Sequence, residues 1–507
     1  MNEVLPAARA LLAQAARLQR SGRHSQALPF LREAIRLQPD SPYLHRALGE
    51  ALADCGDADA AAECFGEALR RRPQAPHELH LHRAVLFADR LRRDEAAEVE
   101  LQHALALKPD YLPALMNLGN LYEQRGLRAP ALACYRRVLS EPAFAADVHA
   151  GLRAVARARS LIIQPPASSD EPDLHALLAA LGDPAVGADA RVHVEFALGH
   201  SYDRLGEVGP AFSAFSRGNA GLIALHGVRY QRMRQSGLGD ELIRSFDRGA
   251  TPGSSGTPRR VSGPTPLFIC GMFRSGSTLV EQVLAAHPAV EPGGEVDWLL
   301  RLVVERLSPF PQSMARLDAA DLQALGDEYL THLRGLFPTA DGKTLITDKR
   351  PENFQFIGLI KRLLPDAKFI HTVRQPVDNG LSVFMQHINP RVAPYACRLE
   401  DIGHYYGEYR RLMAHWKSLY PLDILDFDYD EFIRSPEDEA RRLLAFVGLP
   451  WDASCLEFHK LRNTVKTASY WQVRQPIFGS ASGRWRRYLP HLEPLLQTLR
   501  EQGVETG

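Results

Sequence analysis

The sequence lacks any long apolar run and any excess of charge of one sign. No stretch approaches the roughly 18 uninterrupted apolar residues of a transmembrane helix. The 60 basic and 60 acidic side chains cancel, which argues against a general binder of nucleic acid or of membrane surfaces. The first residues show no basic region followed by an apolar one, as a signal peptide would. We therefore expect a cytoplasmic protein that binds neither nucleic acid nor membrane.

Cysteine is scarce, and no two cysteines form a CxxC pair. The six are scattered along the chain as Cys55, Cys64, Cys134, Cys270, Cys397 and Cys455. This spacing argues against both a disulfide framework and a zinc site. No group of aspartate and histidine residues has metal-ligand spacing either, so we expect no metal.

The first half of the chain repeats a pattern of small and bulky apolar residues. An alanine recurs every 34 to 36 residues, a bulky residue follows four positions later and a small apolar residue seven positions later. The alanines are Ala27, Ala61, Ala97 and Ala131, and the bulky residues are Leu31, Phe65, Leu101 and Tyr135. Gly49 and Gly119 stand twelve positions before two of these alanines, where two helices must approach closely. The pattern predicts tetratricopeptide repeats stacked into a helical solenoid, with a plain helical bundle as the alternative.

The repeat pattern is interrupted by a polar segment with several prolines at 163–173. It returns once, at about 192–225, where Gly199, Ala211 and Phe215 have the same spacing as the glycine, alanine and bulky residue of the earlier repeats. A stretch rich in Gly, Pro, Ser and Thr follows at 249–265 and predicts a linker or exposed loop. We therefore predict a repeat array over 1–160, a linker segment with one further repeat over 161–262, and a last domain over 263–507.

In the last domain the pattern changes from helices alone to strands alternating with helices. Short apolar runs at 266–272, 344–349, 368–374 and 422–428 predict buried strands with helical segments between them. This alternation favours an α/β domain with a parallel sheet covered on both faces. In such sheets ligands bind at the carboxyl ends of the strands.

The first of these strands leads into the segment Gly271-Met-Phe-Arg-Ser-Gly-Ser-Thr278, followed by an amphipathic helix. This is the setting of a P-loop, in which backbone N–H groups and a helix N-terminus hold an anion. Ser277 stands where a nucleotide-hydrolysing P-loop has its lysine, while Arg274 supplies a cation earlier in the loop. The loop therefore predicts anion binding without ATP or GTP hydrolysis, although glycine-rich strand–helix turns also occur without function.

The segment PLFICGMFRSGSTLVEQVLAAHPAV resembles the 5′-phosphosulfate loop of sulfotransferases that use 3′-phosphoadenosine 5′-phosphosulfate (PAPS). The resemblance covers roughly 264–490 and is strongest to protein-tyrosine sulfotransferases and to bacterial sulfotransferases with tetratricopeptide repeats. It implies PAPS as co-substrate. The residues it assigns to the 5′-phosphate and the sulfuryl group are Arg274, Ser275, Gly276, Ser277 and Thr278.

Later residues match the rest of the nucleotide site of that family. Arg374 and Ser382 have the spacing of its 3′-phosphate ligands, although an arginine at a strand end is often only a surface residue. Tyr429 resembles the tyrosine that contacts the nucleotide. The segment 467–488 resembles the family's closing segment over the cofactor, and Ser469 and Arg484 fall on its positions that touch the cofactor. Its basic and aromatic cluster at 483–488 also suits a purine nucleotide.

Catalysis of sulfuryl transfer needs a base for the acceptor proton and cations for the leaving group. Glu295 lies 21 residues beyond Arg274, at the base position of the family. The family has two acidic residues in succession there, whereas this chain has Gly294 and Glu295; a first-turn helix glutamate is the alternative interpretation. Lys349 resembles the lysine near the bridging oxygen and would act with Arg274. We expect His287 to end its helix before Pro288 and to have no catalytic role.

These observations favour a helical-repeat array fused to a P-loop-like α/β sulfotransferase domain. The predicted reaction moves a sulfuryl group from PAPS to a hydroxyl, for which a tyrosine of a protein or peptide held in the repeat groove is one candidate. Carbohydrate, lipid and small-molecule hydroxyls stay open as acceptors. One alternative is an interaction scaffold with an inactive transferase domain. A second is a P-loop kinase, although the absence of the P-loop lysine at Ser277 argues against it.

Overall fold

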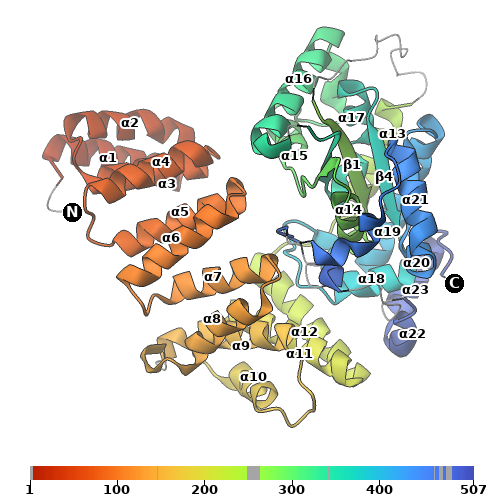
Figure 1. The fold of residues 1–507 in the computed structure, drawn as a ribbon, viewed down its shortest axis with the longest axis horizontal. Coiled ribbons are helices and arrows are strands. Elements are labelled where there is room, and N and C mark those ends of the chain that lie inside the picture. Colours follow the sequence, from red (N-terminus) through yellow and green to blue (C-terminus); the bar gives the residue numbers. More distant parts are fainter. Residues whose placement is uncertain are drawn as a thin grey trace. The chain divides into compact units, whose positions relative to one another are not determined.

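The computed structural model describes residues 4–144, 147–247, 263–340, 342–461, 463–467, 472–475 and 482–506. The chain forms two compact units, Met1–Ile163 and Gln164–Gly507 (Figure 1). Most of the stretch rich in Gly, Pro and Ser at 249–265 lies outside the described residues. None of the described helices is both long and apolar enough to cross a membrane.

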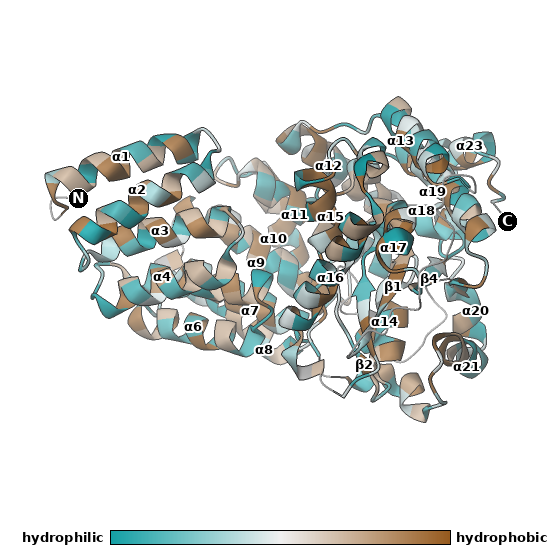
Figure 2. Cartoon of the chain, turned by 90° about the horizontal axis from the view of Figure 1, so that it is seen from above, coloured by the Kyte–Doolittle hydropathy of each residue, from teal (hydrophilic) through white to brown (hydrophobic). Residues whose placement is uncertain are grey.

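Unit 1 consists of consecutive helices that pack against their chain neighbours. They are α1 Pro6–Arg20, α2 His24–Leu37, α3 Pro42–Asp54, α4 Ala58–Arg70, α5 Pro76–Val85, η1 Leu86–Arg90, α6 Asp94–Leu107, α7 Leu112–Gln124, α8 Arg128–Ser140, η2 Pro142–Phe144, η3 Asp147–His149 and α9 Ala150–Ile163. Hydrophilic and hydrophobic residues alternate along these helices (Figure 2). The pattern is that of helices with one buried face.

The recurring residues of the predicted repeats form the packed interior of unit 1. All four alanines are fully buried, and so is the Tyr135 side chain on α8. A Cβ atom at Gly119 on α7 would lie 2.6 Å from Cε1 of Tyr135, and one at Gly49 would lie 2.8 Å from Cε1 of Phe65. The two glycines therefore let the paired helices approach closely, and the predicted solenoid of tetratricopeptide type is confirmed.

We expect Gly119→Ala to lower the free energy of unfolding by about 1–3 kcal/mol, the usual cost of overpacking. Tyr135 is poorly placed to move away, because its hydroxyl donates to Glu123 Oε1 at 2.6 Å and also lies 2.8 Å from Asn120 Oδ1. Gly66→Ala in α4 is the matched control, since its nearest neighbours would lie 3.9 Å away and alanine favours a helix. Urea unfolding followed by circular dichroism compares the two, and equal stabilities would contradict the close approach.

Unit 2 places a five-stranded parallel sheet among helices. Its strands are β1 Thr265–Gly271, β2 Val290–Glu291, β3 Leu345–Lys349, β4 Lys368–Val373 and β5 Ile424–Asp428. Their order is β2-β3-β1-β4-β5, and Leu267 on β1 is in register with Lys368 on β4. The four strands predicted from apolar runs are present, and the parallel α/β fold is confirmed. The two-residue strand β2 was not predicted.

The helices of unit 2 cover both faces of this sheet. They are α10 Pro172–Gly182, α11 Ala188–Leu205, α12 Val208–His226, α13 Arg232–Ser245, α14 Ser277–Ala285, α15 Trp298–Glu305, α16 Ala319–Leu336, α17 Ile357–Leu363, α18 Pro376–Phe384, α19 Leu399–Leu419, α20 Tyr429–Arg434, α21 Pro436–Val447, α22 Trp485–Tyr488 and α23 Glu493–Glu501. Leu267 and Ile269 pack with α14, α20 and α21, whereas Phe268 and Cys270 pack with α16, α17 and α19. Both sides of β1 are buried, which explains its uninterrupted apolar sequence.

The returning repeat, which forms α11 and α12, belongs to the interior of unit 2. Phe196 and Phe215 join the same apolar cluster as Phe268 of the sheet. Asn219 Nδ2 donates to the backbone oxygen of Phe384 on α18 at 2.8 Å. Gly199 approaches Phe215 as Gly119 approaches Tyr135, since its Cβ would lie 2.6 Å from the ring. This segment therefore packs as part of the unit that carries the sheet.

Candidate functional site

The carboxyl ends of the parallel strands bring the predicted residues to one edge of the sheet. Strand β1 ends at Gly271, before the loop with Arg274, and β3 ends at Lys349. Arg374 follows β4 directly, and Tyr429 follows β5. Parallel strands end on the same side, so four chain segments far apart in sequence contribute to one site.

The loop between β1 and α14 turns through three left-handed residues. The φ angles are 152° at Gly271, 67° at Arg274 and 107° at Gly276. A Cβ at Gly276 would lie 3.0 Å from Cδ2 of Tyr429, so this glycine also allows the loop to approach β5 and α20 closely. A left-handed residue that is not glycine costs free energy, and such residues cluster at functional sites. The loop leads directly into the first turn of α14, whose backbone N–H groups can donate hydrogen bonds to an anion.

Two of the predicted loop residues also make contacts within the protein. Ser275 Oγ donates to Met272 O at 2.7 Å and shares a 2.6 Å hydrogen bond with Thr372 Oγ1. Its backbone N–H donates to the same carbonyl at 3.2 Å. Ser275 therefore shapes the loop from inside. Thr278 Oγ1 lies 3.1 Å from Thr467 Oγ1, a residue of the predicted closing segment.

Two arginines concentrate positive charge beside the loop. Arg374 Nη1 donates to the backbone oxygen of Arg274 at 3.2 Å, and its guanidinium lies 4.9 Å from the ring centroid of Tyr429. Arg274 Nε donates to Ser382 Oγ at 3.2 Å. Burial, and after it the charge of Arg374, lowers the pKa of Arg274 to about 10. A buried cation destabilised in this way gains most from a bound anion.

Lys349 and Glu295 form an ion pair at the end of β3. Lys349 Nζ lies 2.9 Å from Glu295 Oε1, and only 1% of the lysine side chain is exposed, against 37% for the glutamate. The backbone before Glu295 is fixed to the strand, because Lys349 N–H donates to Gly294 O at 2.9 Å. Gly293 must be a glycine here, since a Cβ would lie 1.9 Å from Thr347 O.

The alternative interpretation of Glu295 as a first-turn helix glutamate is wrong. Helix α15 begins at Trp298, and Asp297 is its N-cap. Glu295 instead lies in the loop between β2 and α15, where its carboxylate contacts Lys349. His287, by contrast, has structural partners, as expected: its Nε2 lies 3.2 Å from Pro450 O, and its Nδ1 accepts from Ala289 N–H at 3.1 Å.

A carboxylate of the returning repeat, which the sequence analysis missed, anchors the closing segment. Asp203 on α11 pairs with Arg484 at 2.5 Å and Arg487 at 3.2 Å, and accepts from Tyr488 O–H at 2.7 Å. No motif could have indicated this contact, because Asp203 and Arg484 lie 281 residues apart. Ser469, the other predicted residue of the closing segment, lies outside the described residues.

His200 stands one helical turn before Asp203 and faces the same cations. Burial lowers its pKa to about 4, and the charge of Arg484 and, more weakly, of Arg274 acts in the same direction. A histidine with that pKa is neutral at physiological pH and can accept as well as donate a hydrogen bond. Helix α11 therefore contributes polar groups to the surroundings of Arg274 and Arg484.

We expect Asp203→Asn to lower the free energy of unfolding by about 1–3 kcal/mol, because two arginines and a tyrosine lose their shared carboxylate. Added adenosine 3′,5′-bisphosphate should raise the melting temperature of this variant more than that of the parent, since an anion would neutralise Arg484. Asp240→Asn is the control, because Asp240 and its partner Arg411 are exposed and such pairs contribute about 0–1 kcal/mol. An unchanged nucleotide-induced shift would mean that Arg484 does not face the nucleotide.

Comparisons with known proteins divide the chain in the same way. Residues 266–453 match the model of the sulfotransferase family, and residues 18–84 match a tetratricopeptide repeat model. These matches confirm the predicted combination of repeats with a sulfotransferase domain.

Curated relatives align with less than half of the chain. An uncharacterized protein of Aquifex aeolicus is 35% identical over 248 residues, which are 46% of this chain and 32% of that protein. Protein-tyrosine sulfotransferase A of Caenorhabditis elegans is 24% identical over 247 residues, 44% of this chain and 62% of the relative. Human protein-tyrosine sulfotransferase 1 is 24% identical over 250 residues, 44% of this chain and 64% of the relative. The chain thus spans from about a third to just under two thirds of these relatives.

The solved structures to which parts of this chain are similar include the sulfotransferase domain from the Synechococcus PCC 7002 olefin synthase. That domain has 20% sequence identity and a TM-score of 0.36, and the alignment covers 50% of this chain and 99% of the domain. The pilus biogenesis factor PilW has 18% identity and a TM-score of 0.33, with 43% of this chain and 94% of PilW covered.

Proposed function

We propose that this protein transfers a sulfuryl group from PAPS to the hydroxyl of an acceptor. The observation that carries the proposal is the Lys349–Glu295 pair, which lies at the same sheet edge as the loop with Arg274. A buried ammonium beside a half-exposed carboxylate supplies both a cation for a leaving group and a base for an incoming hydroxyl. The match of residues 266–453 to the sulfotransferase family supports the same reaction.

The residues present fit a nucleotide with phosphates at both its 5′ and 3′ positions. The loop at 271–278 and the first turn of α14 would hold the 5′-phosphate and the sulfuryl group. Arg374 and Ser382 would hold the 3′-phosphate, with Tyr429 beneath the Arg374 guanidinium. Arg484, which is paired with Asp203, is a third cation near Arg274 and Arg374.

In the proposed reaction the acceptor oxygen attacks the sulfur atom, and the bond from sulfur to the bridging 5′-phosphate oxygen breaks. Glu295 takes the hydroxyl proton as the new bond forms. Lys349 and Arg274 stabilise the negative charge that develops on the leaving phosphate. The products are a sulfate monoester and adenosine 3′,5′-bisphosphate. The Lys349–Glu295 ion pair stabilises both groups in the free protein and has to separate as they take up these two roles.

Isothermal titration calorimetry with adenosine 3′,5′-bisphosphate, PAPS and ATP tests the proposed donor. We expect the two 3′-phosphorylated nucleotides to bind more tightly than ATP. Preference for ATP would indicate a kinase, and absence of binding to all three would indicate an interaction scaffold. Transfer of labelled sulfate from PAPS to acceptors in a cell extract then tests the reaction itself.

A protein or peptide acceptor held by the repeats is a second part of the proposal. Tetratricopeptide arrays bind extended partners along their concave surfaces. A cavity of about 670 Å³ in unit 1 is lined by charged side chains of both signs, with Arg70 paired to Glu67 and Arg93 paired to Asp59, which suits a polar peptide segment. The names of the curated relatives make a tyrosine hydroxyl the acceptor to try first.

Removing residues 1–163 should leave nucleotide binding unchanged and impair transfer to a macromolecular acceptor. Unit 1 and unit 2 have separate apolar cores, so the shortened chain keeps the interior of unit 2 intact. Calorimetry with adenosine 3′,5′-bisphosphate and a labelled-sulfate transfer assay are run on both proteins. Equal transfer to the native macromolecular acceptor would exclude the repeats from its recognition.

A further inference from the structure

Two histidines and a glutamate come together on one pair of helices in unit 1. His80 lies on α5, whereas Glu100 and His103 lie three residues apart on α6, which packs against α5. One ring nitrogen of each histidine and one carboxylate oxygen of Glu100 all lie within 4.8 Å of one another. Within the part of the chain that the structure describes, this is the one group of three histidine, cysteine or acidic side chains that converges so closely.

These side chains form the donor set of an open zinc site. Two imidazoles and a carboxylate are a usual set of protein ligands for Zn²⁺, and they leave the fourth tetrahedral position to water or another ligand. Metal–ligand distances of about 2.0–2.2 Å put neighbouring ligand atoms about 3.3 Å apart. His80 Nδ1 and Glu100 Oε2 share a hydrogen bond of 2.6 Å, so they would separate by only about 0.7 Å to admit an ion.

The cluster has a buried side and an exposed side. The Glu100 side chain is 9% exposed and that of His80 16%, whereas His103 is exposed on α6. A buried carboxylate is costly unless a cation or hydrogen-bond donors compensate its charge, and Glu100 lies between two groups that do so. An ion can reach the cluster from solvent past His103, whose side chain is free of a packed environment and can turn toward it.

Arg83 is the cation that already neutralises Glu100. Its Nη1 lies 2.7 Å from Glu100 Oε1, which leaves the other carboxylate oxygen, Oε2, on the side of His80. The arginine therefore holds the carboxylate with one oxygen toward the two imidazoles. Its positive charge also repels a metal cation, so it should weaken binding without blocking the ligand atoms.

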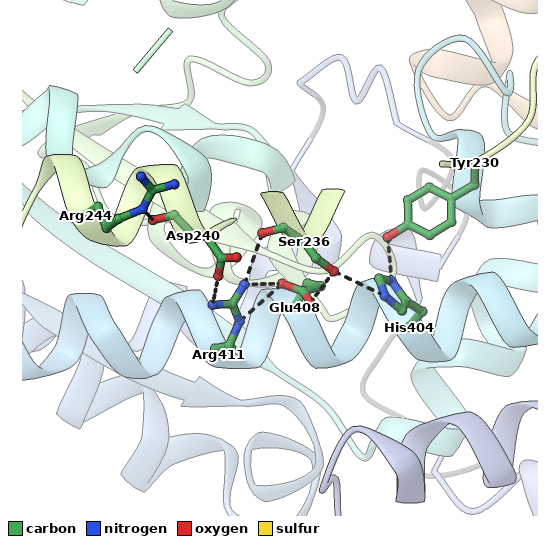
Figure 3. Close-up of polar contacts among 7 residues, drawn as sticks. All are labelled: Tyr230, Ser236, Asp240, Arg244, His404, Glu408 and Arg411. Carbon is green, nitrogen blue, oxygen red and sulfur yellow. Dashed lines mark hydrogen bonds and ion pairs between the residues drawn. The ribbon is translucent and has the colours of Figure 1, made fainter. Parts of the chain in front are cut away.

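A polar cluster on α13 and α19 of unit 2 shows a histidine and acidic residues in a different arrangement (Figure 3). Tyr230 O–H lies 3.0 Å from His404 Nδ1. Arg411 lies between two carboxylates, 2.6 Å from Glu408 and 2.7 Å from Asp240. An arginine thus takes the place between the acidic groups that a metal ion would need, and the cluster joins two helices by hydrogen bonds and ion pairs. In the cluster of unit 1, Arg83 approaches Glu100 alone, and the two imidazoles converge on its other oxygen.

We infer that His80, Glu100 and His103 bind a Zn²⁺ ion that joins α5 to α6. The ion replaces the hydrogen bond between His80 and Glu100, and water completes its coordination. Because the ligands converge only when the two helices are paired, the ion stabilises folded unit 1. The expectation that the chain holds no metal was based on sequence spacing, which does not reveal this cluster, since His80 and Glu100 lie 20 residues apart on different helices.

The experiment titrates the full chain, without an affinity tag, with ZnCl₂ in a calorimeter. Titration with CoCl₂ gives a second readout, because tetrahedral Co²⁺ absorbs visible light far more strongly than Co²⁺ in water. His103→Ala removes one ligand at an exposed position, where folding should tolerate the change. His175→Ala is the matched control, since His175 is an exposed histidine on α10 in unit 2. Arg83→Gln removes the competing charge beside Glu100.

We expect the parent and the His175→Ala variant to bind one Zn²⁺ with equal affinity. The His103→Ala variant should lose about 100-fold or more, since losing even a hydrogen-bonding partner of a ligand costs about 10–100-fold. Zn²⁺ should raise the melting temperature of the parent and not that of this variant. Failure of the parent to bind either ion, or equal affinity of the parent and the His103→Ala variant, would overturn the inference.

The Arg83→Gln variant tests where the ion lies. Loss of a positive charge next to Glu100 should make Zn²⁺ binding tighter than in the parent, which a site elsewhere on the chain would not show. An affinity no higher than that of the parent would mean that the ion does not share Glu100 with Arg83, and the assigned ligands would be wrong.

Discussion

Glu295→Gln is expected to lower the rate of a single turnover by about 10²–10⁴-fold, the usual contribution of a positioned general base. Glutamine keeps the shape of the side chain, and its amide oxygen can still accept the hydrogen bond from Lys349 that Glu295 Oε1 accepts at 2.9 Å. It cannot take the proton of the acceptor. Nucleotide affinity should change little, because the loop at 271–278 and Arg374 hold the donor.

Rapid-quench measurement of labelled-sulfate transfer, with saturating PAPS, isolates the chemical step. Glu305→Gln is the control, since Glu305 ends the helix that follows Glu295 and is exposed in an ion pair with Arg301. Melting temperature and nucleotide binding are recorded on the same samples, because Lys349 is buried and loses a charged partner in the Glu295 variant. A folded, nucleotide-binding Glu295→Gln variant that turns over within a few-fold of the parent would remove Glu295 from the mechanism.

Arg374→Ala is expected to weaken adenosine 3′,5′-bisphosphate binding and to leave AMP binding almost unchanged. Losing one partner of a desolvated charge pair costs about 2–5 kcal/mol, which corresponds to roughly 30- to several-thousand-fold in affinity. Arg374 is 8% exposed and lies over Tyr429, so a phosphate that reaches it is largely withdrawn from water. The two nucleotides differ only in the 3′-phosphate, which makes their comparison specific for this contact.

Tyr429→Phe provides a matched control for the arginine variant. Phenylalanine keeps the ring face on which the Arg374 guanidinium lies, 4.9 Å from the centroid. We therefore expect the Tyr429→Phe variant to keep its preference for the 3′-phosphorylated nucleotide in calorimetry. Equal weakening of both nucleotides by Arg374→Ala would show that the arginine supports the fold and does not read the 3′-phosphate.

Local patterns were sufficient to predict much of the fold. The buried strands of a parallel sheet carry nearly continuous apolar residues, so β1, β3, β4 and β5 could be found from the sequence. The spacing of glycine and a bulky partner predicted the close helix contact that Gly119 and Tyr135 make. Strand β2 has only two residues, too few for any pattern to indicate.

The candidate site was predicted residue by residue, but its contacts were not. The contact between Lys349 and Glu295 depends on the backbone pairing of Gly294 with β3, which no spacing reveals. The Asp203 contact joins two segments that lie 281 residues apart in the chain. Side chains brought together only by tertiary packing leave no periodic signal in the sequence.

The position of α11 and α12 has a consequence for recombination of this protein with others. A hybrid gene that replaced everything up to the glycine- and proline-rich stretch would discard Phe215, Asn219 and Asp203. Phe384 would then lose its hydrogen bond from Asn219, and Arg484 its carboxylate. A crossover between Ile163 and Gln164 keeps these contacts. Repeat arrays of different length or specificity could therefore be exchanged at that point by evolution or by a protein engineer, whereas the last helix pair with the repeat pattern must be inherited with the transferase.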